Sequence, residues 1–418
     1  MRENTVDRFA RLRQDDRNQQ DYRFWVSDME TVCIDGSMGE GGGQILRTSL
    51  ALSCITGKHL HIENIRAARP RPGLARQHLS CVRAACQISQ GRSEGAALGS
   101  QVLDFAPGCV RSGDFSFRIG SAGSVSLVIQ TVLPALSLAD RPSTVTVTGG
   151  THNPWAPPFD FLAETFLPAI ASAGFGAECK LVKHGFFPAG GGKITFAVQP
   201  WQRSTETKIE LIVENAEAEL KLKHSATSAN SAVKRLTPSR KQMINLCEPI
   251  EKRQIHARIY TARLPAHIAH RQEKLLCKSG LRIKNFEHID VTDSDGPGNC
   301  IMLRLCTRGR TTVFTAFGAK GKPSERVVDE VARPAGSFIS SGATIDRFSA
   351  DQLLIYMAIS NSRLGGEKPA PARAGGAYTT NELSTHLTTN IETIKKFLPV
   401  NFNIQSQERN HQITCKPS

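Results

Sequence analysis

The stretch TVCIDGSMGEGGGQILRTSLALSCITG, residues 31–57, decides the fold of this chain. Its first five residues, Thr31–Asp35, predict a buried strand, and the apolar run Gln44–Thr56 predicts a helix. A glycine-rich turn joins the two, and Gly57 follows the helix at the position where glycine takes the left-handed conformation at little cost. A strand, a glycine turn and an apolar helix in this order predict an α/β unit.

The same pattern recurs along the chain. The small residues GSAGS open a second apolar helix, Ser124–Leu138, and a third apolar helix is expected over SADQLLIYMAIS, residues 349–360. Helices, alternating strands and turns follow each of them. A strand near 115–119 is expected to close the first unit, and a helix is expected over 159–172 in the second. The repetition predicts an α/β (α+β) fold with a core of three repeated units.

Between the second and third units the pattern changes, with strands expected at 255–262, 300–306 and 312–317 and helices at 265–279 and 324–339. This stretch predicts a separate, inserted α/β domain. Within it, residues 219–258 are basic and poor in apolar side chains. We therefore divide the chain into a disordered tail or mis-assigned start at 1–28, core repeats one and two at 29–200, the inserted domain at 201–340 and core repeat three at 341–418.

The composition of the chain limits the classes of partner and of cellular environment that we expect. The chain has 418 residues, and its charge is 52 − 38 = +14, so either a polyanionic partner such as nucleic acid or a solvated basic surface is expected. No apolar run reaches the ~20 residues of a membrane helix, so we expect no membrane association. The 11 cysteines form no CxxC pair and no Cys/His spacing of a zinc site, which favours free thiols and a cytoplasmic protein.

The turn GEGGGQILR, residues 39–47, is the first candidate for chemistry. Glycines before a helix let backbone N–H groups approach an anion, and Glu40 beside such a cradle suits a hard divalent cation. Arg47 follows one helical turn after Gly43. The spacing matches neither a P-loop nor a dinucleotide fingerprint, and a purely structural turn is the alternative.

A basic loop, RAARPRPGLARQHL, provides a second candidate. Arg66 and Arg69 lie among prolines that stiffen the loop, and Gln77 and His78 follow in the first turn of the next expected helix. Arginine is well suited to binding phosphate, whereas a solvated run of charge is the alternative.

Two isolated polar residues complete the candidates. Gln130 is the single polar side chain in an apolar helix, so it is either a satisfied core glutamine or a nucleotide-reading group. His386 lies among hydroxyl residues in STHLTTN, and a neutral imidazole is a nucleophile at pH 7. Asp351 in a neighbouring element is expected to orient it.

Taken together, these stretches resemble the RNA 3′-terminal phosphate cyclase family. The resemblance rests on DGSMGEGGGQILR, RPGLARQHL, GSAGS with Gln130, GGTHNPWAPP, GFFPAGGG, DGPGN, ADQL and THLTTN, in the order of the family. It implies three core units, each with two helices on a four-stranded sheet, and a smaller α/β domain inserted between units two and three.

The resemblance also implies a ligase reaction. ATP adenylylates a histidine, the AMP moves to an RNA 3′-phosphate to give RNA(3′)pp(5′)A, and the 2′-OH then closes a 2′,3′-cyclic phosphate and releases AMP. The matching positions are His386 as nucleophile and Glu40 as ligand of Mg²⁺ or Mn²⁺. The ATP contacts match Gln130, Phe348, Ser349, Ala350, Asp351 and Gln352, and the phosphate and RNA contacts match Arg47, Arg66, Arg69, Gln77 and His78.

The chain departs from the family in a few places. Phe348 stands where a tyrosine is usual, the stretches 216–246 and 363–376 look extended, and residues 1–28 have no counterpart. Two other activities are weighed: a non-catalytic RNA-binding relative that acts in ribosome biogenesis, which would lack the histidine, and an enolpyruvyl transferase on a similar fold. The oligomeric state is open, with a homodimer among the options.

Overall fold

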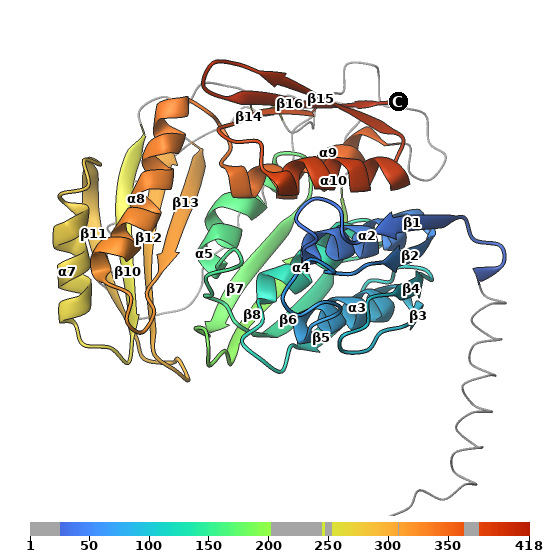
Figure 1. Ribbon diagram of the computed structural model, residues 1–418, viewed down its shortest axis with the longest axis horizontal. Helices are drawn as coiled ribbons and strands as arrows, with labels where there is room; N and C mark the ends of the chain where they lie inside the picture. The colour runs from blue at the N-terminus through green and yellow to red at the C-terminus, as the bar shows by residue number, and fades with distance from the viewer. Residues whose placement is uncertain (1–25, 202–244, 247–252, 308, 363–375) are drawn as a thin grey trace, which may run out of the picture.

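The computed structural model describes residues 26–201, 245–246, 253–307, 309–362 and 376–418. In these residues the strands form four sheets of four strands each. Three sheets surround a common layer of helices, and the fourth lies in a lobe at the left of Figure 1. The predicted α/β class and its threefold repetition with an additional α/β element are therefore confirmed.

The first sheet has the strand order β1-β2-β4-β3 and carries two helices. We expected a strand near 115–119 to close this sheet, but that strand lies in the second sheet. The fourth strand of the first sheet is instead the short, polar β3. The elements are β1 (Thr31–Asp35), α2 (Gly43–Thr56), β2 (His59–Glu63), α3 (Arg76–Ser89), β3 (Arg92–Glu94) and β4 (Leu103–Ala106).

The second sheet has the order β5-β6-β8-β7. The helix expected over 159–172 is interrupted by a π-helical turn, η1 (Leu162–Phe166), a feature frequent at functional or strained places in helices. The other elements are β5 (Asp114–Arg118), α4 (Val125–Leu136), β6 (Ser143–Gly149), α5 (Phe159–Phe161), α6 (Leu167–Ala171), β7 (Ala177–Lys183) and β8 (Gly192–Val198).

The third sheet has the order β15-β16-β14-β9. Its edge strand β9 comes from the stretch assigned to the insertion and pairs parallel with β14, so residues 245–246 belong to the core sheet. The elements are β9 (Asn245–Leu246), α9 (Arg347–Asn361), β14 (Gly376–Thr380), α10 (Thr385–Phe397), β15 (Val400–Ser406) and β16 (His411–Pro417).

The lobe is built on the sheet β11-β10-β12-β13 and has its own apolar core beneath two helices. Strand β11 was not predicted from the sequence, because its residues, IKNFEHIDV, are largely polar and show no apolar run. Such a composition is typical of an exposed edge strand. The elements are β10 (Gln254–Ala262), α7 (His267–Leu276), β11 (Ile283–Val291), β12 (Gly298–Thr307), β13 (Arg310–Phe317) and α8 (Ser324–Ser341).

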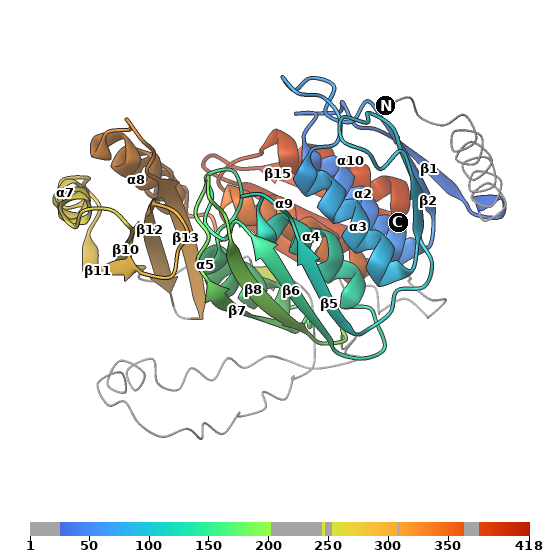
Figure 2. The same ribbon diagram turned by 90° about the horizontal axis from the view of Figure 1, so that it is seen from below.

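The helices of the three core units pack on one another in the middle of the molecule, as Figure 2 shows for α2, α3, α4, α9 and α10. Leu50 of α2, Val128 of α4 and Leu353 of α9 are completely buried. A helix buried on most of its sides needs apolar residues all round, which explains why α2, α4 and α9 lack a polar face. None of the helices in the described ranges is long and apolar enough to cross a membrane.

A polar network fastens the lobe to the second unit. Glu164 on η1 accepts hydrogen bonds from Arg258 Nη1 at 2.6 Å and from Arg304 Nε at 2.5 Å. The Tyr260 hydroxyl donates to Asp160 at 2.7 Å. Because one partner of each pair lies on the core and the other on the lobe, Glu164 of the π-turn and Asp160 of α5 hold the two parts together.

Several sequence expectations lie largely outside the described residues. These are the N-terminal tail up to residue 25, the basic stretch 219–258 up to residue 252 except for 245–246, and the extended stretch 363–375. The cysteines within the described ranges are all free thiols.

Candidate active site

The glycine turn before α2 lies at the centre of the site. Gly39 and Gly41 have positive φ angles of 60° and 55°, which favour glycine. A Cβ atom on Gly42 would lie 3.3 Å from Arg69 Nη2 and 3.7 Å from His386 Cε1. The missing side chain therefore lets the turn approach two of the residues that the sequence singled out.

His386 lies in the first turn of α10. Ser384 caps this helix by accepting a hydrogen bond from the Leu387 amide, as a serine at an N-cap does. His386 Nε2 lies 3.1 Å from Glu40 Oε2, and both side chains are about two-fifths exposed. The helix start and the glycine turn thus bring together two residues that are 346 positions apart.

The surroundings of His386 disfavour protonation of its imidazole. Partial burial lowers the pKa of His386, and the positive charges of Arg47 and Arg69 lower it further, while the Glu40 carboxylate acts in the opposite direction. A neutral imidazole carries a free lone pair on one ring nitrogen, which a nucleophile requires.

The two arginines of the basic loop have different environments. Arg69 Nη2 lies 3.4 Å from Glu40 Oε2, so Arg69 belongs to the same cluster as His386. Arg66 has a positive φ of 56°, and its Nη1 donates to the Gly73 carbonyl at 2.7 Å. Arg66 therefore braces its own loop, and its remaining N–H groups are the ones available to a ligand.

His78 and Gln77 open α3. His78 is buried, and its Nδ1 accepts a hydrogen bond from the Ala75 amide at 3.0 Å. Burial, with repulsion from Arg47 and Arg66, lowers the pKa of His78 to about 3. A Cβ on Gly43 would lie 2.3 Å from His78 Nε2, so this nitrogen faces the glycine turn. Gln77 is half-buried and faces the loop at Gly123.

A pocket of about 40 Å³ lies where α2, α4, α9, α10 and η1 meet. Gln130 and Gln352 join across it, with 2.6 Å between Gln130 Nε2 and Gln352 Oε1. The residues that line it are Gln44, Arg47, Thr48, Gln130, Phe166, Gln352, Ile355, Tyr356 and Asn390.

The pocket contains buried polar atoms without partners. Among the described residues, Arg47 Nε, the Tyr356 hydroxyl and Asn390 Oδ1 make no hydrogen bond. Leaving a buried polar atom unpaired costs about 1–3 kcal/mol. A donor and acceptor set of this kind at one pocket indicates a polar ligand.

Asp351 borders the pocket without touching His386. Its Oδ2 accepts a hydrogen bond from Gln44 Nε2 at 3.0 Å, and its buried Oδ1 has no partner among the described residues. Burial raises the pKa of Asp351 to about 7. The expectation that Asp351 orients His386 is thus not met in this structure, in which Glu40 contacts the imidazole instead.

The other residues of the predicted ATP segment divide into two groups. Asp346 caps α9, and its carboxylate accepts from the buried Ser349 hydroxyl at 2.5 Å; Ala350 is completely buried. Phe348 is 47% exposed, and the Arg347 guanidinium lies 4.6 Å from its ring centroid. Ser349 and Ala350 therefore hold the helix start in place, whereas Phe348 and Gln352 face solvent or the pocket.

Sequence reasoning missed several residues of the pocket. Gln44 continues the glycine turn, and Asn390 follows His386 by four residues, so both have a place in motifs that were already singled out. Thr48 and Tyr356 sit in apolar helices, and only the packing of α2 against α9 and α10 shows that they line a cavity.

Comparisons with known proteins identify the family. The family model of RNA 3′-terminal phosphate cyclase matches residues 38–404. The chain is 42% identical to an RNA 3′-terminal phosphate cyclase of Koribacter versatilis, over 91% of this chain and 93% of that protein. It is 40% identical to proteins of the same name from Ectopseudomonas mendocina, over 88% and 92% of the two chains, and Ralstonia nicotianae, over 90% and 93%. The chain therefore belongs to the RNA 3′-terminal phosphate cyclase family, a family of ligases.

Proposed function

We propose that this protein uses ATP to convert an RNA 3′-phosphate into a 2′,3′-cyclic phosphate, with His386 as the nucleophile. The observation that carries the proposal is the cluster of His386, Glu40 and Arg69 at the glycine turn. Gly42 has no side chain there and so leaves room for Arg69 and His386. The imidazole is partly exposed and its pKa is lowered, so at neutral pH it has a lone pair to offer. Family membership supplies the reaction class.

In the first step, a ring nitrogen of His386 attacks the α-phosphorus of ATP. An N–P bond forms, the bond from Pα to the bridging oxygen breaks, and pyrophosphate leaves. Phosphoryl transfer depends mainly on positioning and on neutralising charge. Arg47 and Arg69 lie close enough to His386 to lower its pKa, so they are placed to attract the phosphate oxygens.

The contact between Nε2 and Glu40 has a consequence for this step. A ring nitrogen that donates to a carboxylate has no free lone pair. Attack by Nε2 therefore requires the Glu40 carboxylate to turn away from the imidazole. Within the described residues, the contacts of Glu40 with His386 and with Arg69 both use Oε2, so Oε1 is available to a ligand.

The donor set around Glu40 fits a hard divalent cation. Mg²⁺ is commonly held by one or two carboxylates together with substrate phosphates and water. Glu40 would provide the carboxylate, and the bound ion would neutralise phosphate charge. If the carboxylate turned toward such an ion and away from Nε2, the His386 lone pair would be free.

The nucleotide contacts follow from the pocket and its rim. A purine nucleoside is far larger than the 40 Å³ pocket. The nucleotide therefore occupies the rim, with its base against the exposed Phe348 ring, or it parts Gln130 from Gln352. Arg47 Nε, Asp351 Oδ1 and Asn390 Oδ1 are the atoms that gain partners.

The second and third steps use the RNA end. An oxygen of the 3′-phosphate attacks the phosphorus of the histidine-AMP, the N–P bond breaks, and RNA(3′)pp(5′)A forms. The vicinal 2′-OH then attacks the activated 3′-phosphorus and displaces AMP. The family resemblance assigns Arg66, Gln77 and His78 to the phosphate and the RNA end, and His78 Nε2 faces the glycine turn. Of these, His78 acts only as a neutral group, because its pKa is about 3.

Incubation with ATP labelled in the α-phosphate, followed by RNA with a 3′-phosphate, tests the proposal. The protein should become labelled by ATP alone and should lose the label when the RNA is added, while a cyclic end appears. An RNA-binding relative without catalysis, or an enolpyruvyl transferase, would take up no label. Absence of label on the protein in the presence of Mg²⁺ or Mn²⁺ contradicts the proposed function.

A further inference from the structure

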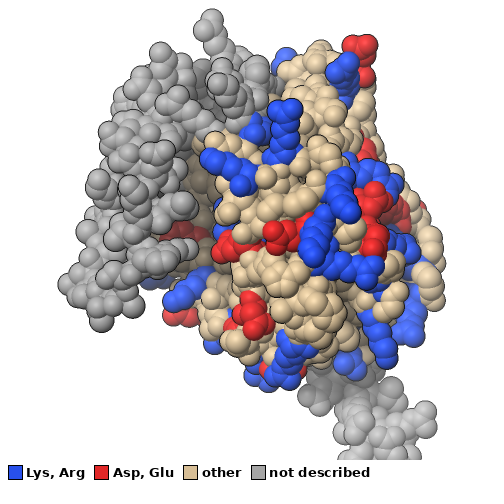
Figure 3. Space-filling model, turned by 90° about the vertical axis from the view of Figure 1, so that its left-hand side faces the viewer, with Lys and Arg blue, Asp and Glu red and all other residues tan. Residues whose placement is uncertain are grey.

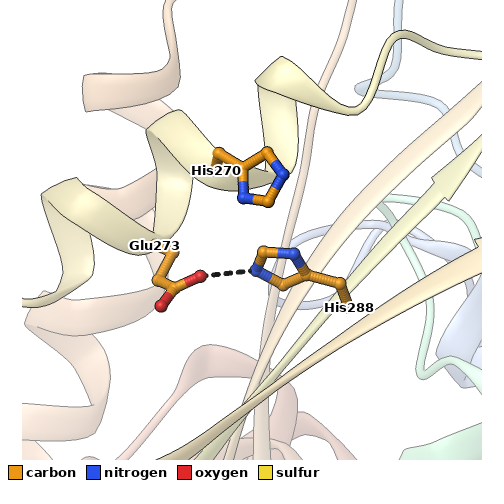
Figure 4. Close-up of side chains that lie close together, drawn as sticks. All are labelled: His270, Glu273 and His288. Atoms are coloured by element: carbon orange, nitrogen blue, oxygen red, sulfur yellow. Dashed lines mark ion pairs between the residues drawn. The ribbon is translucent and has the colours of Figure 1, made fainter.

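Three side chains with metal-binding atoms meet on the lobe, away from the site described above. His270 and Glu273 lie one helical turn apart on α7, and His288 lies on the edge strand β11. Figure 4 shows that all three point toward one another. One ligand atom from each residue lies within 4.8 Å of those of the other two.

The contacts within this trio are close but incomplete. Glu273 Oε2 lies 2.7 Å from His288 Nε2. The rings of His270 and His288 face each other edge to face, with 5.0 Å between centroids and 64° between planes. In the part of the chain that the structure describes, His270 makes no hydrogen bond or ion pair. The helix and the strand thus present a paired carboxylate and imidazole and, beside them, a second imidazole.

The chemistry of the three donors selects one class of ion. Two imidazoles and one carboxylate are a common ligand set of Zn²⁺ and neighbouring transition metals, whereas Mg²⁺ and Ca²⁺ prefer oxygen ligands. Zn–N and Zn–O bonds are about 2.0–2.2 Å long, so two ligand atoms of a tetrahedral zinc lie roughly 3.3 Å apart. Small rotations of exposed side chains bring atoms within 4.8 Å to that separation.

The surrounding surface favours a small cation over a polyanion. Figure 3 views the molecule from the side on which α7 and β11 lie, and Lys and Arg side chains are interspersed there with Asp and Glu. Arg271 on α7 pairs with Glu325 at 2.5 Å, and on α8 Arg326 pairs with Glu330 and Arg333 with Asp329. The pairing of Arg271, which follows His270 on α7, offsets the charge of that arginine, which would otherwise repel a metal ion.

We propose that His270, Glu273 and His288 bind one Zn²⁺ ion, with water completing the coordination. The ion joins α7 to β11, which pairs with a strand, β10, on one side only. An edge strand that a metal holds to a neighbouring helix is less free to fray or to pair with other chains. The site is independent of the proposed reaction, because none of its elements carries a residue of the candidate active site.

Calorimetric titration of the metal-free full-length protein with Zn²⁺ tests the proposal. We expect one zinc-binding event that His288→Ala and Glu273→Gln each weaken by at least about tenfold, the loss typical even of substitutions behind the ligands. His267→Ala is the matched control, because His267 lies on the same helix, is exposed and is outside the trio. Glu40→Gln, which alters the other candidate metal site, should leave this event unchanged.

Two further measurements accompany the titration. Zinc should raise the melting temperature of the wild type and of His267→Ala but not that of His288→Ala. Far-ultraviolet circular dichroism checks that the variants are folded, and Co²⁺ in place of Zn²⁺ should give the visible absorption of a tetrahedral site. Absence of zinc binding by the wild type, or equal binding by His288→Ala and His267→Ala, would overturn the proposal.

Discussion

Two histidine–glutamate pairs in this protein have similar geometry and different surroundings. His386 and Glu40 lie 3.1 Å apart at the junction of α10 with the glycine turn, and His288 and Glu273 lie 2.7 Å apart on the outside of the lobe. Arg47 and Arg69 act on the first imidazole. The neighbour of the second pair is another imidazole, that of His270.

The side chains around each histidine decide which chemistry its imidazole can perform. Cations beside His386 disfavour its protonation and attract phosphates, so this imidazole suits nucleophilic attack on a nucleotide. A second imidazole beside the other pair, and the pairing of the neighbouring Arg271 with Glu325, make that pair a candidate for a metal.

His386→Ala should abolish formation of the AMP adduct and ATP-dependent cyclisation, a loss of at least about 10³-fold, because the nucleophile is removed. His411→Ala on β16 is the control and should form the adduct at the wild-type level. The His386 variant should still cyclise synthetic RNA(3′)pp(5′)A, since that step needs positioning but no nucleophile. Wild-type adduct yield from His386→Ala would show that the two pairs are misassigned.

Arg69→Ala should lower the rate of adduct formation by about 10²-fold, comparable to the loss of one preorganised charge donor in other enzymes. Arg66→Ala should also reduce overall activity, because Arg66 braces the same loop through the Gly73 carbonyl. Substitution of Lys234, in the basic stretch outside the described residues, should have a smaller effect at physiological salt. Equal losses of activity from Arg69→Ala and Lys234→Ala would show that Arg69 acts only by long-range attraction of phosphate groups and not as part of a preorganised site.

The pH dependence of kcat/KM for ATP should reflect the lowered pKa of His386. The neutral form is the active one, so activity should persist below pH ~6.5, the ordinary histidine value, and fall as the pH drops through the lowered pKa. Arg69→Gln removes a positive charge and should move the acid limb to higher pH, whereas Glu40→Gln should move it to lower pH. Acid limbs that coincide in the wild type and in Arg69→Gln would mean that the arginine does not act on the imidazole.

Two glycine substitutions, one in the candidate active site and one in the lobe, should have smaller and opposite effects on stability. Gly43→Ala places a Cβ 2.3 Å from His78 Nε2 and should reduce both stability and adduct formation. Gly336→Ala in α8 meets only Leu281 Cδ2 at 3.9 Å and should stabilise the protein by about 0.5–1 kcal/mol through helix propensity. Thermal unfolding of both variants measures the difference. An equal change in melting temperature would show that the glycine turn is not closely packed.

Much of the fold followed from periodicity, and the exceptions have physical causes. The apolar helices Gly43–Thr56, Val125–Leu136 and Arg347–Asn361 were predicted within a few residues, because burial on most sides leaves an unmistakable apolar run. Strands β3 and β11 were missed, because short or edge strands are stabilised by pairing and not by an apolar pattern of their own. The π-turn at 162–166 has no local signal in the sequence, and its Glu164 contacts Arg258 and Arg304, which lie far away along the chain.

The candidate site divides in the same way. Glu40, Arg47, Arg69 and His386 lie in motifs and come together in the structure. The pairing of Asp351 with Gln44 could not be predicted, because it depends on how α9 packs against α2. The trio on the lobe was also missed, since it needs the unpredicted strand β11 to bring His288 beside α7.

Mass spectrometry of the protein after incubation with ATP and Mg²⁺, without RNA, shows whether His386 is the nucleophile. We predict a single AMP adduct, located by peptide mapping on the His386 imidazole and absent from His386→Ala. We also predict that addition of RNA with a 3′-phosphate removes the adduct. An unmodified protein, or an adduct on another residue, would contradict this assignment.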